Sequence, residues 1–405
     1  DKLGDCQPAL QLLHDLGFEQ YTSTDKKIGV KIKVNGADDA KLASMRRIYD
    51  EMYYRNSARA LVHRQEFNCK ALMGEFPPKY KDGRKKAVFK LVVPNGAEDC
   101  PGSLVYARHQ LLELPAFIPD PTDFIQHRMK MEANIYEYIS NTTDASKLHF
   151  YVNFADANLF GFYNGSLFAQ DEIMTLEHPI LAALRERLLA SDGKDSDKLV
   201  AYCRGSVIVS NALKHGHFSQ DKLAKIYGSK FAGATVDKIK KSVEICNPPI
   251  VDNIVCIASL MGMGKKYKQS EIETLLKTAY CGFNGAVCEA LHQQLKEQKE
   301  KASDSDNTEQ EEQDEKKSMD ANENKKRTVI HTGNWGCGAF GGNIEVHSML
   351  QVIAAVAAGA DFMHYHAVDK RSLKKAQQGC EVLLKQLYPK CKDKKGRLKT
   401  KAFVA

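Results

Sequence analysis

The feature that most constrains the fold of this chain is a glycine-rich segment near its C-terminal end. Residues 332–343 read Thr-Gly-Asn-Trp-Gly-Cys-Gly-Ala-Phe-Gly-Gly-Asn and contain five glycines. The residue pattern predicts a strand just before this segment, over 327–332, and a helix just after it, over 343–358. Glycine lets backbone N–H groups turn toward an anion, and a helix N-terminus adds partial positive charge. The segment is therefore predicted to be a loop that binds a diphosphate.

The residues upstream of this loop favour an α/β fold. An aromatic and β-branched run over 148–154 is followed by a loop rich in Asn and Gly and by a helix over 167–177. Similar units continue to a last predicted strand over 361–368. Strand, polar loop and helix in succession are typical of an α/β layer whose ligand loops follow the strand ends. We expect a mixed sheet with flanking helices.

The first 145 residues are predicted to form a separate, mainly helical accessory region. Apolar residues at helical spacing indicate one helix over 38–64 and another from Asp123 to Ile139. The segment 86–93, which contains three valines and a phenylalanine and is followed by Pro-Asn-Gly, indicates a strand. The predicted domains are therefore residues 1–145 and residues 146–405.

Charge is distributed unevenly along the 405 residues, whose net charge is +7. The segment 296–327 holds eleven acidic and eight basic residues and only three apolar ones. It cannot bury enough apolar surface to offset its ordering entropy, and we expect a charged, flexible insertion. Removing its net −3 leaves +10 on the remainder, a balance that suits a phosphate-rich ligand.

The cysteine pattern argues against a disulfide-bonded or zinc-binding protein, and the hydrophobic runs argue against a membrane-spanning one. Eleven cysteines are an odd number, and no Cys-x-x-Cys pair occurs, so reduced thiols in an intracellular chain are expected rather than disulfides or a zinc site. The longest apolar run, 349–363, is too short to span a bilayer. We expect no membrane, no nucleic-acid partner, no metal and no cofactor.

Two acidic residues at a predicted helix start are candidates for chemistry. Asp171 and Glu172 follow Gln170 in the first turn of the helix, where acidic side chains commonly serve capping and the helix dipole alone. Apolar Phe168 and Ile173 flank them, and a partly desolvated pocket raises a carboxyl pKa toward general-acid use. Both interpretations remain open from these residues.

A pair of histidines lies on the last predicted strand. His364 and His366 alternate with Tyr365 and so share one face. No third ligand is evident, so a core or pocket-lining role is favoured over metal binding.

Together these segments resemble poly(ADP-ribose) glycohydrolase and its macrodomain relatives. Residues 332–342 are nearly identical to the diphosphate-binding loop of that family, and Lys277–Phe283 resembles a segment that precedes the loop. The strand residues Val152–Ala155, followed by 170–172, resemble the strand and the Gln-Glu-Glu catalytic signature. The resemblance covers about residues 148–370 and implies a macrodomain-like fold for the second domain.

The resemblance implies a role for each matching residue. Glu172 would be the catalytic acid that protonates the atom leaving the ribose, and Asp171 would hydrogen-bond ribose hydroxyls. Gln170 would line the nucleotide pocket. The residues assigned to ADP-ribose binding are Gln170, Asp156, Asn158, Gly161, Asn334, Gly336, Cys337, Gly338, Ala339, Phe340 and Gly341.

Two departures from the family pattern bear on the substrate. Phe160-Gly161-Phe162 stands where the family has three consecutive glycines, and Asp171 replaces a glutamate. These changes favour an ADP-ribosyl hydrolase that removes mono-ADP-ribose from arginine on a modified protein, for example ubiquitin. The alternatives are a poly(ADP-ribose) glycohydrolase and a non-catalytic ADP-ribose reader. We expect a monomer in the cytoplasm or nucleus, or in the host cytosol if the chain is a bacterial effector.

Overall fold

The computed structural model describes residues 19–22, 28–31, 60–138, 145–191, 200–262, 266–304 and 326–405. Contacts divide the chain into two units, residues 1–56 with 300–325 and residues 57–299 with 326–405. In the first unit, β1 (Glu19–Thr22) pairs antiparallel with β2 (Ile28–Lys31). The helix expected over 38–64 lies outside the described residues except at its end, where a strand begins at Leu61.

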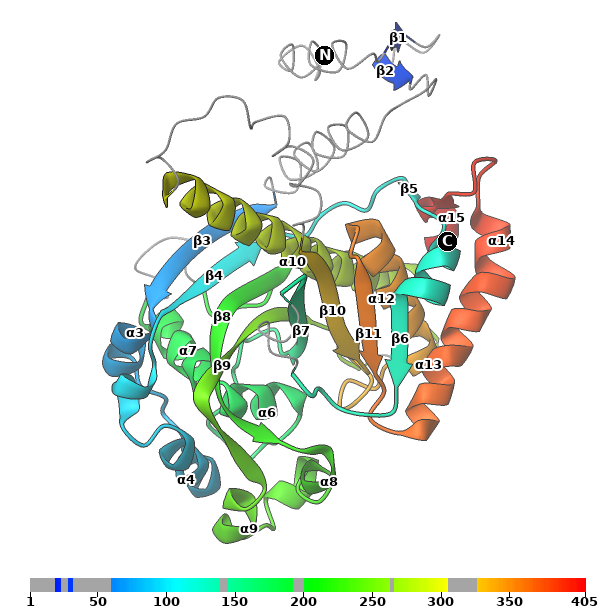
Figure 1. Ribbon diagram of the computed structural model, residues 1–405. Coiled ribbons are helices and arrows are strands. Elements are labelled where there is room, and N and C mark those ends of the chain that lie inside the picture. Colours follow the sequence, from blue (N-terminus) through cyan, green and yellow to red (C-terminus); the bar gives the residue numbers. More distant parts are fainter. Residues whose placement is uncertain are drawn as a thin grey trace. The chain divides into compact units, whose positions relative to one another are not determined.

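The second unit is built on a mixed eight-stranded sheet with the order β3-β4-β8-β9-β7-β10-β11-β6 (Figure 1). The strands from β9 to β6 are parallel, while β3, β4, β8 and β9 pair antiparallel. A separate antiparallel pair joins β12 to β5. The strand bounds are β3 (Leu61–Asn68), β4 (Ser103–His109), β5 (Phe117–Ile118), β6 (Met129–Glu132), β7 (Lys147–Ala155), β8 (Ser206–Phe218), β9 (Val243–Ala258), β10 (Arg327–Gly333), β11 (Phe362–His366) and β12 (Leu398–Lys399).

Helices cover both faces of this sheet. They are α3 (Cys69–Glu75), α4 (Gly83–Val92), α5 (Pro121–Asp123), α6 (Gln170–Glu177), α7 (Pro179–Ser191), α8 (Gln220–Leu223), α9 (Val236–Lys240), α10 (Gln269–Asp304), α12 (Ile344–Ala358), α13 (Lys370–Val382), α14 (Tyr388–Cys391) and α15 (Thr400–Val404). Short 3-10 turns occupy Gly96–Asp99 and Gly228–Phe231, and π turns occupy Phe124–Arg128 and Leu383–Leu387.

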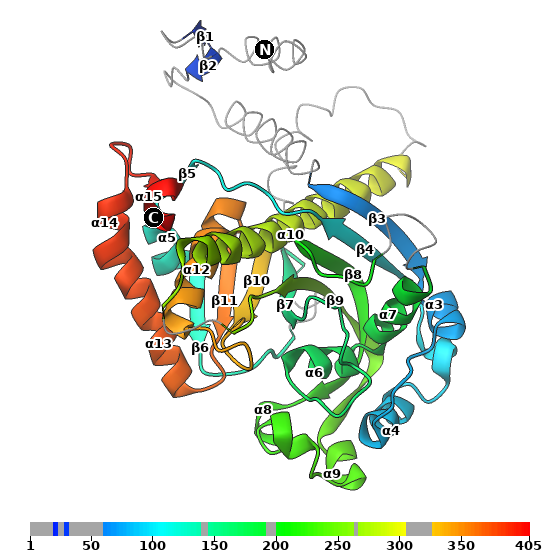
Figure 2. The same cartoon turned by 180° about the vertical axis from the view of Figure 1, so that it is seen from behind.

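Alternating side chains of the central strands build two hydrophobic cores, one on each face of the sheet. In β9, Ile254 and Cys256 belong to one core, while Val255 and Ile257 belong to the other. The first core includes α3, α4, α6 and α7, and the second includes α10, α12 and α13. Figure 2 shows α10 crossing the strands on this second face. The predicted mixed α/β architecture is confirmed.

The segment 86–93, expected to be a strand, is instead the greater part of helix α4. Asp82 is the N-cap, because its carboxylate accepts hydrogen bonds from the N–H groups of Arg84 and Lys85. Val88 and Val92 lie one turn apart and are both buried. The helical period of these two residues, together with the cap, outweighs the β propensity of the run.

The N-terminal 145 residues differ from the expected helical region. The helix expected from Asp123 to Ile139 is replaced by α5, a π turn and the strand β6, in which Met129 and Met131 alternate with polar residues. The strands β3, β4 and β6 all join the same sheet as β7. The contact boundary therefore lies at residue 57 and not at residue 145.

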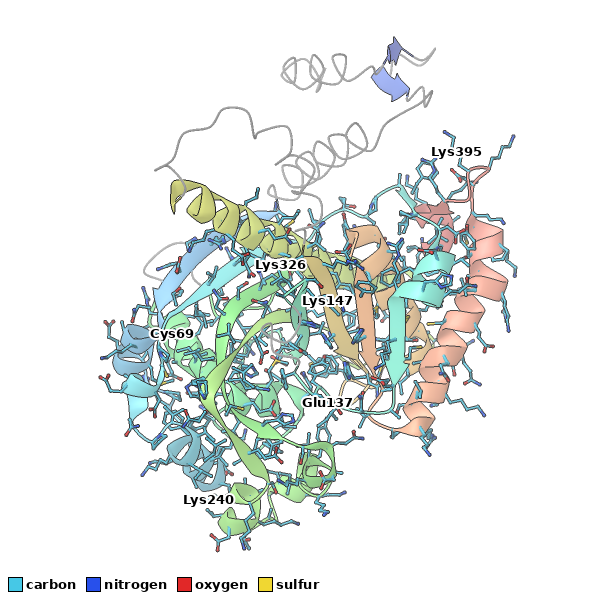
Figure 3. All side chains as sticks on the ribbon, in the orientation of Figure 1. Cys69, Glu137, Lys147, Lys240, Lys326 and Lys395 are labelled. Atoms are coloured by element: carbon cyan, nitrogen blue, oxygen red, sulfur yellow. The ribbon has the colours of Figure 1, made fainter. Side chains whose placement is uncertain are left out.

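Most segments after residue 145 follow the sequence analysis. The strands predicted over 148–154 and 361–368 are β7 and β11, and the helix after the glycine segment is α12. In the charged segment, α10 extends to Asp304, and residues 305–325 lie outside the described chain. Lys395, in the basic C-terminal stretch, projects into solvent (Figure 3). None of the described helices combines the length and hydrophobicity needed to cross a bilayer.

Candidate active site

A cavity of about 950 Å³ opens at the carboxyl-terminal edge of the parallel strands. Its lining includes a residue at or just after the end of each of β9, β7, β10 and β11, namely Ser259, Asp156, Asn334 and His366. Parallel neighbours end at the same edge of a sheet, so the loops that follow them converge on one place. The glycine segment and the acidic helix start, 160 residues apart in the chain, therefore share one cavity.

The two predicted catalytic carboxylates enter this cavity from the first turn of α6. The side chains belong to residues that are only 6% (Asp171) and 3% (Glu172) exposed. Gln170, which also lines the cavity, fastens α6 to the end of β7. Its side-chain amide donates to the carbonyl of Val152 (3.0 Å) and accepts from the N–H of Phe154 (2.7 Å). The strand thereby sets the position of both carboxylates.

Asp171 lies in an environment that favours its protonated form. Burial is the main cause that raises the pKa of Asp171, to about 7, and the neighbouring Glu172 carboxylate adds to the rise. Asn153 donates to Asp171 Oδ1 (3.0 Å) and, with the Lys85 charge, acts in the opposite direction. Asp171 therefore keeps its proton to a higher pH than an ordinary aspartate does.

Glu172 has a structural contact as well as a place in the cavity. The N–H of Ala169, the N-cap residue of α6, donates to Glu172 Oε2 (3.0 Å). This is one half of a capping box, and Ala169 has no side-chain oxygen to supply the other half. The capping and cavity interpretations of the acidic pair therefore both apply to the same side chain.

The glycine segment lines the cavity over residues 334–340, so of its predicted binding residues only Gly341 lies outside the lining. Some N–H groups are used within the loop, since Cys337 donates to Asn334 O and Gly341 to Gly338 O, each at 3.0 Å. Within the described chain, no protein acceptor is found for the N–H groups of Gly338, Ala339 and Phe340. These three consecutive donors are free to bind an anion in the cavity.

The glycines of this loop serve two different purposes. Gly336 has φ of +72°, and a Cβ there would lie 2.2 Å from Ser259 Oγ and 2.7 Å from His347 Cε1. Gly336 is thus required by packing against the buried imidazole of α12. A Cβ on Gly338 would meet nothing within 4 Å. The absent side chain of Gly338 leaves open space beside the free N–H groups.

The loop after β7 is only partly in the cavity. Asp156 lines it as predicted, whereas Asn158 and Gly161 do not. A Cβ on Gly161 would lie 2.9 Å from both Cβ and O of Asn158, so this glycine permits a tight turn. Phe160 is fully buried in the core, while Phe162 lines the cavity and is 48% exposed. The two phenylalanines therefore do not act as a pair.

A row of histidines behind the cavity was not foreseen as a unit. His149 Nδ1 lies 2.8 Å from His331 Nε2, and His331 Nδ1 lies 3.0 Å from His366 Nε2. His366 in turn places Nδ1 2.8 Å from Asn134 Oδ1 and lines the cavity, as the sequence favoured. The row crosses three neighbouring strands, β7, β10 and β11. Only the strand register brings these histidines together, and the register is not visible in the sequence.

One family model and several known proteins match this chain. The family model described as poly(ADP-ribose) glycohydrolase (PARG), Macro domain fold, matches residues 126–375, more than half of the chain. A curated relative, "Probable poly(ADP-ribose) glycohydrolase 2" of Arabidopsis thaliana, is 39% identical over 62 residues. That match spans 15% of this chain and only 12% of the length of the relative.

Solved structures of similar proteins carry the same family name. A poly(ADP-ribose) glycohydrolase from Thermomonospora curvata aligns over 92% of this chain and 96% of its own, with 9% identity and a TM-score of 0.36. One from Deinococcus radiodurans in complex with ADP-ribose aligns over 81% and 98%, with 11% identity and a TM-score of 0.37. On the extent of the family-model match, this chain belongs to the poly(ADP-ribose) glycohydrolase family with the macro domain fold.

Proposed function

We propose that this chain is a glycohydrolase that cleaves the glycosidic bonds between the ADP-ribose units of poly(ADP-ribose). One observation carries the proposal. A single cavity joins three free backbone N–H groups of the glycine loop to two buried carboxylates at the start of α6. The first element suits a diphosphate, and the second suits acid-assisted cleavage of a glycosidic bond.

The chemistry assigns different tasks to the two carboxylates. Cleavage of the ribose C1–O bond passes through an oxocarbenium-like state and needs a proton on the leaving oxygen. Glu172 supplies that proton, and the resulting carboxylate accepts one from the water that attacks C1. Asp171, held by Asn153, accepts hydrogen bonds from ribose hydroxyls. The diphosphate on Gly338–Phe340 fixes the distance of the ribose from Glu172.

The choice of polymer over mono-ADP-ribose on arginine follows from the family match and from Phe160. Two bulky phenylalanines at the ribose end would favour the arginine-linked substrate. Phe160 is instead in the core, and only Phe162 lines the cavity, so Phe160 does not favour that substrate. The substitution of Asp171 for glutamate remains and still favours the arginine-linked substrate as the second candidate.

A side-by-side assay tests the proposal. The full chain is incubated with poly(ADP-ribose) and, separately, with a protein mono-ADP-ribosylated on arginine, and released ADP-ribose is measured. We expect release from the polymer, and no release by a Glu172→Gln variant. Release from the arginine-linked substrate alone would replace the proposal with the second candidate. Calorimetric binding of ADP-ribose without turnover of either substrate would make the chain a reader.

A further inference from the structure

A lysine from α4 is fully buried behind the carboxylates of the candidate site. Lys85 has no exposed surface, and its Nζ donates to the carbonyls of Tyr163 (3.0 Å) and Leu167 (2.6 Å). Both carbonyls belong to the loop that joins β7 to α6. Lys85 lies outside residues 126–375, the part of the chain that the family model matches. No role in the site follows from the comparisons for this residue.

A buried ammonium group is expensive unless nearby groups compensate for its lost hydration. Burial lowers the pKa of Lys85 to about 8, and the charges of Glu172, Asp82 and Asp171 act in the opposite direction. The two carbonyl acceptors satisfy two of its three N–H donors. Two of the three acidic charges that act on Lys85, those of Asp171 and Glu172, belong to the first turn of α6, the helix that follows the loop bound by its ammonium group.

The same loop is fastened to the start of α4 by further bonds. The N–H groups of Lys81 and Asp82 both donate to the carbonyl of Asn164 (2.8 and 3.0 Å). The hydroxyl of Tyr163 donates to Glu186 Oε1 (2.7 Å) and accepts from the N–H of Lys79 (2.7 Å). The stretch 163–167 is therefore fixed at several points, and Lys85 contributes a fully buried cation to these contacts.

We infer that Lys85 is a positioning residue of the active site, which fixes the 156–169 loop and whose charge favours the ionised form of Asp171. The loop part of this inference is independent of the activity, and the charge part rests on the proposed function. Phe162 and Leu167 of the same loop line the cavity, so its position also shapes the entrance. Lys85 itself does not line the cavity and does not touch substrate.

The test compares Lys85→Met with Lys86→Met in the full chain. Lys86 is the next residue of α4 and is exposed, so its variant is the matched control. Hydrogen exchange followed by mass spectrometry should show faster exchange over 156–169 in Lys85→Met and no change over 333–343. The control should exchange like the wild type. Unchanged exchange over 156–169 in Lys85→Met would overturn the loop assignment.

The charge assignment is tested by the pH profile of kcat for ADP-ribose release. Loss of the Lys85 charge should raise the pKa of Asp171 further and move the acidic limb about 1 pH unit upward, which lowers kcat about fivefold at pH 7. Lys85→Arg keeps the positive charge, and the acidic limb of its pH profile should stay within about 0.3 pH unit of that of the wild type. An unmoved limb in Lys85→Met would overturn the assignment.

Two further outcomes are decisive. Lys85→Gln, which is also neutral, is measured in the same way if Lys85→Met does not fold. If neither neutral variant folds while Lys86→Met does, Lys85 serves the whole fold and the specific assignment is overturned. A wild-type chain that releases no ADP-ribose would contradict the proposed function, while the exchange measurement would still decide the loop part.

Discussion

At the scale of single residues, Glu172 combines a structural contact with the chemical role proposed for it. Its carboxylate caps α6 through the Ala169 N–H and also lines the cavity. Truncation to alanine would remove both functions at once, with a loss of about 1 kcal/mol for the cap alone. A loss of activity in that variant would therefore not distinguish acid catalysis from a displaced helix.

The substitution Glu172→Gln separates the two tasks. The amide oxygen of glutamine still accepts the Ala169 N–H, but the side chain cannot deliver a proton to the leaving oxygen. We expect kcat to fall by about 10²–10⁴-fold, while the melting temperature and the affinity for ADP-ribose stay close to those of the wild type. Kinetics, thermal unfolding and calorimetry on the same preparation check this. Activity within about threefold of the wild type would remove Glu172 from the mechanism.

The raised pKa of Asp171 has a consequence for stability. In the unfolded chain an aspartate has a pKa of about 3.9. Because the folded value is about 7, the folded state holds this proton more tightly, and stability falls as pH rises from about 4 to about 7. The Asp171→Asn variant lacks this pH-dependent loss of stability. Its free energy of unfolding should therefore rise relative to that of the wild type by up to about 1.4 kcal/mol per pH unit in that window. Urea unfolding at pH 5 and pH 8 measures the gain, and an equal difference at both pH values would contradict it.

At the scale of elements, the sequence predicts well where local and tertiary preferences agree. The strands β7 and β11 and helix α12 carry clear patterns and occur where expected. The strand prediction over 86–93 was wrong because helix α4 depends on the Asp82 cap and on the burial of Val88 and Val92, which share one face of the helix. Strand-like composition is a weak predictor where the buried residues are spaced with the period of a helix.

The glycine loop allows a matched pair of substitutions. Gly336→Ala places a Cβ against Ser259 at a positive φ, and should lower the free energy of unfolding by about 1–3 kcal/mol. Gly338→Ala meets no neighbour and should change stability by less than about 0.5 kcal/mol. Its methyl group would intrude on the bound diphosphate, and we expect about tenfold weaker ADP-ribose binding. Wild-type affinity in Gly338→Ala would contradict the placement of the diphosphate.

At the scale of the whole molecule, buried histidines set the response to acid. Burial lowers the pKa of His109, His347 and His366 to about 4, below the value of about 6.5 for an unfolded chain. The unfolded state therefore binds more protons, and stability is lost as pH falls from about 6.5 toward 4. Each histidine contributes up to about 1.4 kcal/mol per pH unit, so together they outweigh the opposite effect of Asp171.

The expected result is a marked fall in stability between pH 7 and pH 5. Denaturant unfolding at half-unit pH steps measures this fall. His109 does not line the cavity, and the His109→Gln variant should show a smaller change in the free energy of unfolding per pH unit. A free energy of unfolding that is constant or higher at pH 5 would show that these imidazoles are not buried in the neutral form.

The limits of prediction are clearest at this scale. Asp171, Glu172 and the 334–340 loop, which the sequence singled out, line one cavity, and each lies within one short segment with a recognisable pattern. Strands β3, β4 and β6, which all precede residue 145, join the sheet of the later residues through pairings that no local pattern encodes. Lys85 and the histidine row were not predicted for the same reason, because the residues that they contact lie far away in the sequence.

The proposed function requires one ADP-ribose to lie across the glycine loop and the carboxylate pair. A crystal structure of the Glu172→Gln variant with ADP-ribose tests it most directly. We predict diphosphate oxygens within hydrogen-bond distance of the N–H groups of Gly338, Ala339 and Phe340, and ribose C1 beside Gln at position 172. A ligand bound elsewhere, or one whose ribose points away from α6, would contradict the claim.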